Sequence, residues 1–147
     1  MNDESNALDV LTHFLDRIWN HGDDEIIARV FVPDGTAQGL AGDNAVLTHD
    51  EYLAFVHMVR AALTDMTFTI LGGLCQGDRA IVRARVQATT PEGRPVDFTG
   101  MCEVVVGDGK ILYAHNAFDF LLMATQMCPD VPADALVRVF TQRSLGI

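Results

Sequence analysis

The segment that decides the fold is Gly109-Lys110-Ile111-Leu112-Tyr113-Ala114-His115-Asn116-Ala117-Phe118-Asp119-Phe120. Successive side chains of a strand point to opposite faces of the sheet. This alternation predicts that Tyr113, His115 and Asp119 share one face with Ile111 and Ala117. The other face carries Leu112, Ala114, Asn116, Phe118 and Phe120. We expect the first face to line a cavity, which places a histidine and a lone carboxylate inside it.

The composition predicts one globular domain spanning residues 1–147, because 49% of the residues are hydrophobic and 20% are charged. A chain of this length buries one core. No stretch approaches the roughly 20 consecutive apolar residues of a membrane-spanning helix. The acidic, polar N-terminus also lacks the basic start and apolar run of a signal peptide. We therefore expect a cytoplasmic protein without a membrane partner.

Charge and metal-ligand patterns exclude two further classes of partner. The formal net charge of -10 repels the phosphates of nucleic acids. The three cysteines, Cys75, Cys102 and Cys128, are an odd number without a C-x-x-C pair, which argues against a disulfide framework. None of the five histidines forms an H-x-x-x-H or H-E-x-x-H pattern. We expect no nucleic-acid partner, no metal and no cofactor.

Three helices are predicted at the N-terminal end. Leucines and an isoleucine at helical spacing predict a first helix that ends near Asn20-His21-Gly22. Residues 23–31 predict a short second helix, which Pro33-Asp34-Gly35 ends in a turn before a polar segment at 36–44. Thr48-His49-Asp50-Glu51 fits a capping box that starts the third helix. The apolar face of this helix, which we expect to lie against a sheet, carries Tyr52, Phe55, Val56, Val59 and Leu63.

From Met66 onward the hydrophobic period becomes two, and short glycine-containing turns separate the strands. The predicted strands are residues 66–74, 79–89, 94–106 and 110–120. Their short connections predict an antiparallel meander, whose long strands can curl around helices and enclose a ligand. Pro129 and Pro132 precede a predicted C-terminal helix that docks through Leu136, Val137, Val139 and Phe140.

This order of elements resembles the nuclear transport factor 2-like fold, an α+β, cystatin-like cone with three N-terminal helices on a curved antiparallel sheet. Two motifs are similar to those of its SnoaL-like polyketide cyclase branch. Ile18-Trp19-Asn20-His21-Gly22-Asp23 resembles the Trp-Asn-x-Gly-Asp that closes the first helix in this group. Residues 107–120, continued by Gln126-Met127, resemble the final hairpin, strand acid and Gln-Leu-Gly ending.

The resemblance implies a cofactor-free enzyme in which an aspartate on the last strand is acid and base in an intramolecular aldol ring closure. Asp119 occupies the matching position. His115 stands where a tryptophan is common, and Cys128 stands where glycine is usual. The resemblance also implies a homodimer formed through the outer face of the sheet.

The candidate catalytic residues are Asp119 and His115. A carboxylate in an apolar cavity has a raised pKa suited to a general base. The structural alternative pairs Asp119 with Arg83 or Arg85, because buried charges require partners. His115 either assists Asp119 by polarising a substrate carbonyl or forms part of the cavity wall.

The candidate substrate-binding residues are Trp19, Tyr52, His57, Met101 and Tyr113. The spacing of Tyr52 and His57 on the third helix indicates that only one of them faces inward. Trp19 either forms the cavity floor or staples the first helix to the sheet. Met101 is either an adaptable cavity contact or an ordinary core residue.

Two function classes follow from these residues. The first is cofactor-free acid/base chemistry, of aldol or isomerase type, on a hydrophobic carbonyl compound. The alternative is a non-catalytic ligand-binding or dimerisation module, because one fold serves many functions. Epoxide hydrolysis on this fold uses an Arg-x-Asp pair that the chain lacks, and steroid isomerisation needs an additional acid or tyrosine pair that the sequence does not place.

Overall fold

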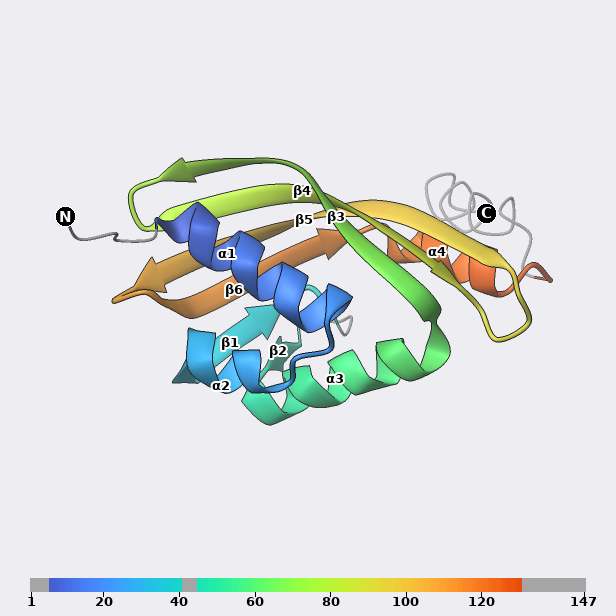
Figure 1. Cartoon of the computed structure of the whole chain (residues 1–147), viewed down its shortest axis with the longest axis horizontal. Coiled ribbons are helices and arrows are strands. Elements are labelled where there is room, and N and C mark those ends of the chain that lie inside the picture. Colours follow the sequence, from blue (N-terminus) through green and yellow to red (C-terminus); the bar gives the residue numbers. More distant parts are fainter. Residues whose placement is uncertain (1–5, 41–44, 131–147) are drawn as a thin grey trace, which may run out of the picture.

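The computed structural model describes residues 6–40 and 45–130. One curved six-stranded sheet carries α1, α2 and α3 on one side, and α4 lies at the far end against β5 (Figure 1). The elements in chain order are α1 (Ala7–Leu15), the π-helix η1 (Asp16–Asn20), α2 (Glu25–Val30), β1 (Phe31–Gln38), β2 (Val46–Leu47), α3 (His49–Ala62), β3 (Thr64–Gln76), β4 (Arg79–Thr89), β5 (Pro95–Gly107), β6 (Lys110–Phe118) and α4 (Phe120–Met127).

The sheet has the strand order β2-β1-β6-β5-β4-β3. The predicted meander is confirmed, since β3 to β6 pair as consecutive antiparallel neighbours. β1 pairs with β6 in parallel, and the short β2 continues the sheet beyond it. The α+β cone predicted from the sequence is therefore the observed architecture.

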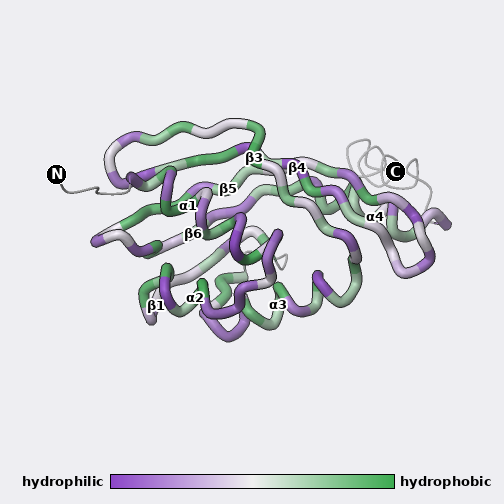
Figure 2. The backbone as a smooth tube through the Cα atoms, viewed as in Figure 1, coloured by the Kyte–Doolittle hydropathy of each residue, from purple (hydrophilic) through white to green (hydrophobic). Residues whose placement is uncertain are grey.

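Apolar residues recur along α1 and the strands, while polar residues concentrate in the hairpin loops (Figure 2). The core lies between the helices and the concave face of the sheet. Its largest fully buried side chains are Leu11, Ile18, Ile26, Val56, Val82, Val96, Val104 and Ile111. Every helix within the described ranges is too short or too polar to span a lipid bilayer.

The end of the first helix is fastened to β3 by one asparagine. Asn20 Nδ2 donates to the carbonyl of Phe68 at 2.9 Å, and the Phe68 amide donates to Asn20 Oδ1 at 2.7 Å. The Arg60 guanidinium also donates to the Trp19 carbonyl at 2.9 Å, which ties α3 to the same turn. The Trp-Asn motif therefore fixes the place of Trp19 relative to the sheet.

The third helix begins as predicted, because the Thr48 amide donates to Glu51 Oε2 at 2.8 Å within a capping box. The segment before it differs from the prediction. Residues 31–38 form strand β1 instead of a turn and a polar segment. Pro33-Asp34-Gly35 falls where the pairing of β1 with β6 is irregular, between Phe31 and Thr36. Such an irregularity accommodates a proline inside a strand.

The end of the last strand also differs from the prediction. β6 stops at Phe118, and Asp119 caps α4, so Phe120 is helical and not part of the strand. Leu122 donates its amide hydrogen to Asp119 Oδ1 at 2.9 Å, which accounts for the change of structure at this residue. The predicted C-terminal helix with Leu136, Val137, Val139 and Phe140 lies outside the described residues.

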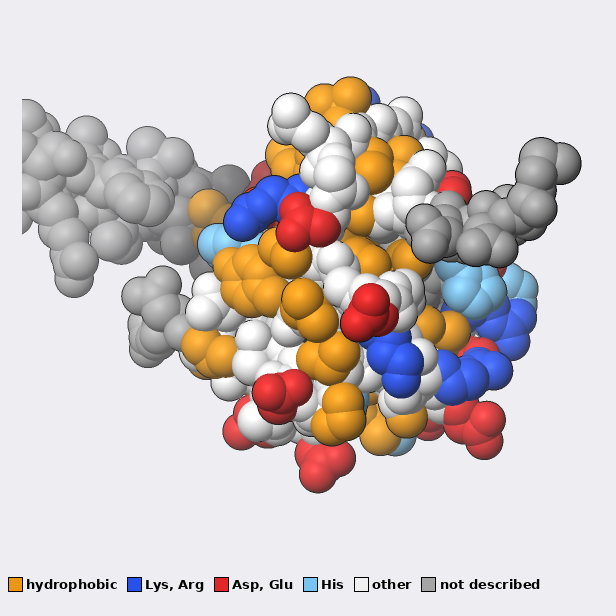
Figure 3. All heavy atoms as spheres, turned by 90° about the vertical axis from the view of Figure 1, so that its left-hand side faces the viewer, with side chains coloured by type: hydrophobic (Ala, Val, Ile, Leu, Met, Phe, Trp, Pro, Cys, Tyr) orange, Lys and Arg blue, Asp and Glu red, His pale blue; other side chains and the backbone are white. Residues whose placement is uncertain are grey.

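Figure 3 shows the end of the molecule at the left of Figure 1, where the β3–β4 and β5–β6 hairpins lie. In this view several basic side chains gather at the right beside histidines, with acidic side chains next to them (Figure 3). Asp23 illustrates this pairing, because both Arg17 and Arg29 form ion pairs with it.

Gly100 of β5 makes room for the Phe118 ring on the concave face. The two residues are directly paired, and a Cβ at residue 100 would lie 2.6 Å from Phe118 Cα and even closer to its ring. We predict that Gly100→Ala destabilises the fold by about 1–3 kcal/mol through overpacking. Urea unfolding measures the change. Gly72→Ala on β3 is the control, because a Cβ there meets no atom within 4 Å; an equal loss in both variants would contradict the prediction.

Candidate functional site

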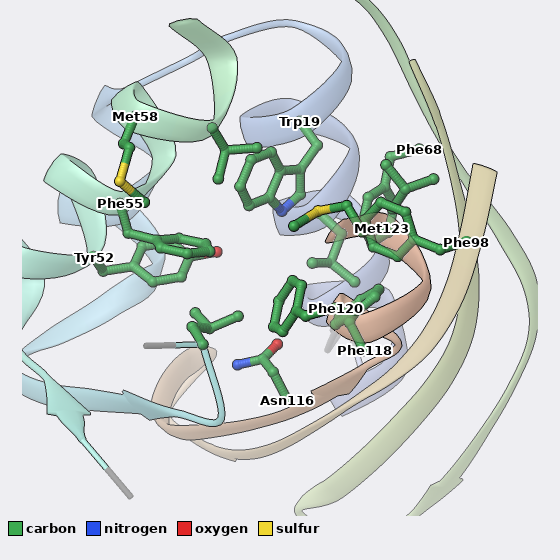
Figure 4. Close-up of a pocket in the computed structure, with 14 residues that line it drawn as sticks. Trp19, Tyr52, Phe55, Met58, Phe68, Phe98, Asn116, Phe118, Phe120 and Met123 are labelled. Carbon is green, nitrogen blue, oxygen red and sulfur yellow. The ribbon is translucent and has the colours of Figure 1, made fainter. Parts of the chain in front are cut away.

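A cavity of about 420 Å³ lies between the helices and the concave face of the sheet (Figure 4). This size falls within the range of about 300–1,000 Å³ that is usual for small-molecule sites. η1, α3, β3 to β6 and α4 all contribute to its wall. The described residues that line it are Leu15, Trp19, Leu40, Tyr52, Phe55, Met58, Val59, Phe68, Val86, Phe98, Asn116, Phe118, Phe120 and Met123.

Aromatic rings form much of this wall. Trp19 lies nearly parallel to Phe68 at a centroid distance of 6.4 Å, and Phe55 meets Trp19 edge-on at 6.4 Å. Phe118 lies edge-on to Phe98 at 6.2 Å and tilted against Phe68 at 6.1 Å. Flat apolar ligands suit such a wall, because aromatic rings pack against one another in offset or edge-to-face geometry.

None of the described lining residues carries a carboxylate, an imidazole, an ammonium or a guanidinium group. The titratable hydroxyl of Tyr52 remains protonated. Burial raises the pKa of Tyr52 far above its usual value, Cys102 adds to the rise, and the Trp19 indole N–H lowers it. The cavity wall formed by these residues is therefore neutral.

Three polar side-chain atoms face the cavity: Trp19 Nε1, Tyr52 Oη and Asn116 Oδ1 (Figure 4). Asn116 is only 8% exposed, and its Nδ2 donates to the Gln38 carbonyl at 3.0 Å. This bond fixes the side-chain amide and joins β6 to β1. A polar end on a bound ligand would meet these three atoms.

A model of the SnoaL-like domain matches residues 11–114, which is well over half of the chain. The chain belongs to the SnoaL-like family. No curated protein matches it.

Solved structures support the same fold. The proposed polyketide cyclase IdmH from Streptomyces antibioticus is 25% identical, with a TM-score of 0.72 over 81% of this chain and 96% of that one. A proposed polyketide cyclase from Acidithiobacillus ferrooxidans is 22% identical, with a TM-score of 0.71 over 86% and 97%. AclR from Streptomyces galilaeus, a proposed hydroxylase, is 17% identical, with a TM-score of 0.72 over 84% and 95%.

The face of β6 that lines the cavity in this SnoaL-like protein is opposite to the predicted one. Ile111 is fully buried, but a bulge against Val105 and Val106 shifts the alternation before Tyr113. Beyond the bulge, Ala114 and Asn116 point inward. The predicted face was wrong because one extra residue in a strand reverses every side chain that follows it.

The two candidate catalytic residues therefore lie outside the cavity. His115 is exposed on the outer face of the sheet, where its ring meets that of Tyr113 at a centroid distance of 6.1 Å. Asp119 is exposed and caps α4 through Leu122. The structure does not bring them together at the cavity wall. The structural alternative, an ion pair of Asp119 with Arg83 or Arg85, is not formed among the described residues, and Arg85 instead donates to Asp97 Oδ1 at 2.8 Å.

The five candidate substrate-binding residues divide into two groups. Trp19 and Tyr52 line the cavity. Met101 is exposed on the outer face of β5, and Tyr113 lies on the outer face of β6, because both follow the alternation of their strands. His57 is exposed on α3, and its Nε2 lies 2.8 Å from Asp24 Oδ2 at the start of α2.

The sequence reasoning missed Asn116, Phe118, Phe98 and Phe68 as site residues. The sequence did contain a signal for Asn116 and Phe118. In the predicted alternation they share a strand face with Phe120, opposite to the face of Asp119. Large aromatic side chains on that face favoured it as the inner one. The bulge allows Asn116 and Phe118 to face inward together with the buried Ile111, and the hydrophobic pattern alone does not predict this bulge.

Gln126, the first residue of the motif that resembles the Gln-Leu-Gly ending of the family, has a structural role. Its side-chain amide pairs with the backbone of Asp97 as a strand would, accepting from the amide at 2.8 Å and donating to the carbonyl at 3.0 Å. Arg94 donates to the Met127 carbonyl at 2.6 Å. These bonds hold α4 against β5, and Phe120 and Met123 thereby close one end of the cavity.

No group of three His, Cys, Asp or Glu side chains in residues 6–40 and 45–130 is arranged to hold a metal ion.

The three thiols of this SnoaL-like protein differ in environment. Cys75 and Cys128 are exposed, whereas Cys102 is buried and burial, with a contribution from Glu103, raises its pKa to about 12. We predict that a thiol-exchange reagent at mildly alkaline pH labels two cysteines in the native chain and the third only after unfolding, because the thiolate is the nucleophile. Mass spectrometry of the labelled chain measures this. Labelling of native Cys102 at the rate of Cys75 would contradict it.

Proposed function

We propose that this SnoaL-like chain binds a neutral, flat, largely apolar carbonyl compound in its cavity. The observation that supports this most strongly is a cavity of about 420 Å³ whose described wall is aromatic and uncharged. Charged ligands are disfavoured, since a buried ion without a partner carries a large desolvation penalty. A neutral ligand with one or two polar groups gains apolar contacts and satisfies the few polar atoms of the wall.

The second candidate function is cyclase-type acid/base chemistry on the bound compound, with Asp119 as acid and base. Membership of the family and the likeness to IdmH, a proposed polyketide cyclase, favour it. Asp119 adjoins two residues of the cavity wall, Phe118 and Phe120. To reach a ligand its carboxylate would have to give up the Leu122 amide. Assistance by His115, on the outer face, is not part of this candidate.

Homodimer formation and a cytoplasmic location stay predictions. The outer face of the sheet carries Met101 and Leu112, whose exposed fractions are 47% and 42%. A homodimer through this face would bury both side chains. Sedimentation equilibrium measures the oligomeric state, and Met101→Lys is expected to favour the monomer.

Trp19, the one tryptophan of the chain, reports occupancy of the cavity directly. We predict that an acetylnaphthalene quenches its fluorescence saturably and raises the melting temperature, because binding to the native state stabilises it. Val59→Phe fills the cavity from α3 and is expected to weaken binding about tenfold or more, which corresponds to about 1.4 kcal/mol. Ala61→Phe, at an exposed residue of the same helix, is the control. Equal affinity in both variants would place the ligand elsewhere.

Asp119 separates the two candidate functions. We predict that Asp119→Asn retains both stability and ligand binding, because asparagine is an equally good N-cap, whereas Asp119→Ala loses about 1 kcal/mol of stability. Thermal unfolding and the Trp19 titration measure these quantities. The test of catalysis uses a ketone that both binds and is cyclised by the unaltered chain. Full turnover by Asp119→Asn would rule out Asp119 as the acid/base. Loss of turnover with binding intact would rule out a purely binding role.

A further inference from the structure

The orientation of Asn116 is decided by its partner. The Gln38 carbonyl can only accept a hydrogen bond, so the side-chain atom of Asn116 that faces it at 3.0 Å is the amide nitrogen. The amide oxygen then faces the cavity, as Figure 4 shows. No described residue donates a hydrogen bond to this oxygen. The sheet side of the cavity therefore presents an open acceptor.

Tyr52 presents the opposite polarity from the helical side. The indole N–H of Trp19, the other polar group that the helices bring to the cavity, is a donor only and cannot accept the Tyr52 hydroxyl proton. The Tyr52 hydroxyl therefore keeps its one O–H donor for another partner. No described residue accepts its proton, and the hydroxyl lies at the cavity wall (Figure 4). The helical side therefore presents an open donor.

We propose that the cavity selects a neutral aromatic compound with a hydrogen-bond acceptor at one end and a donor at the other. A carbonyl oxygen of the ligand accepts from the Tyr52 hydroxyl, and a ligand hydroxyl donates to Asn116 Oδ1. Tyr52 and Asn116 are thus the specificity-determining residues of the site. This inference rests on the proposed ligand-binding function and adds the polarity that the ligand must have.

The two contacts discriminate because the described wall is otherwise apolar except for the Trp19 indole N–H. A ligand that lacks the carbonyl or the hydroxyl leaves a buried polar atom of the protein without a partner and gains nothing in exchange. Each missing group is expected to weaken binding about tenfold, the usual scale for one lost buried hydrogen bond. The aromatic rings bind all such ligands alike and do not contribute to the preference.

Four related naphthalenes test the inference by isothermal titration. They are 6-acetyl-2-naphthol, its methyl ether, the corresponding ethylnaphthol, and the methyl ether of that ethylnaphthol. The first keeps both polar groups, the second loses the donor, the third loses the acceptor and the fourth loses both. We expect the acetylnaphthol to bind about tenfold more tightly than either singly altered compound, with the doubly altered compound weakest.

Tyr52→Phe is the decisive variant. It is expected to abolish the preference for acetyl over ethyl and to leave the preference for hydroxyl over methoxy unchanged. The variant ring retains its packing, since Phe14 and Phe31 lie at centroid distances of 6.0 and 5.9 Å. Tyr113→Phe alters the other tyrosine, on the outer face of β6, and is expected to change neither preference.

The outcomes separate this inference from the function on which it rests. The four compounds could bind with equal affinity, compete with one another and lose binding in Val59→Phe. That outcome would overturn the inference and leave the binding function standing. An acetyl preference that survives Tyr52→Phe would also overturn it. Failure of every compound to bind would overturn both.

Discussion

A single bulge on β6 is the constraint on which the site depends. Ile111 must face the core, where it is fully buried, and Asn116 and Phe118 must face the concave surface, where they line the cavity. A regular strand cannot do both, because residues 111 and 116 alternate to opposite faces. The irregular pairing of Ile111 and Tyr113 with Val105 and Val106 resolves the conflict. The bulge turns the histidine outward and the asparagine inward.

Two further local devices shape the cavity once the strand is turned. Gly100 lets the Phe118 ring lie across β5, and Asn20 fastens the end of the first helix to Phe68, which sets Trp19 on the opposite wall. Gln126 then holds α4 across one end. The result is an aromatic cavity with three polar side-chain atoms and no charged group among its described lining residues. The described wall of this cavity can therefore bind and orient a ligand, but it holds no acid/base group in position to act on that ligand.

Much of the fold could be predicted from the sequence because its signals are local. The capping box at Thr48 and the glycine-containing turns between the strands act over a few residues, and the structure confirms the helix and the meander they predicted. β1 was missed because its pairing with β6 overrides the turn tendency of Pro33-Asp34-Gly35. The cavity-facing residues of β6 were missed because a bulge depends on the pairing of two strands. Trp19 and Tyr52 do line the cavity. Tyr52 was a candidate through the apolar face of its helix and Trp19 through its motif, and neither depends on the register of two strands.

A crystal structure of the chain with bound 6-acetyl-2-naphthol would show at once which face of β6 meets the ligand and how the ligand is oriented. We expect the ligand between Trp19 and Phe118, with its carbonyl oxygen within hydrogen-bond distance of the Tyr52 hydroxyl and its hydroxyl beside Asn116 Oδ1. A ligand held on the other face of β6, in contact with His115, would overturn the assignment of the cavity as the site, and a ligand in the cavity with its polar ends reversed would overturn the assigned polarity.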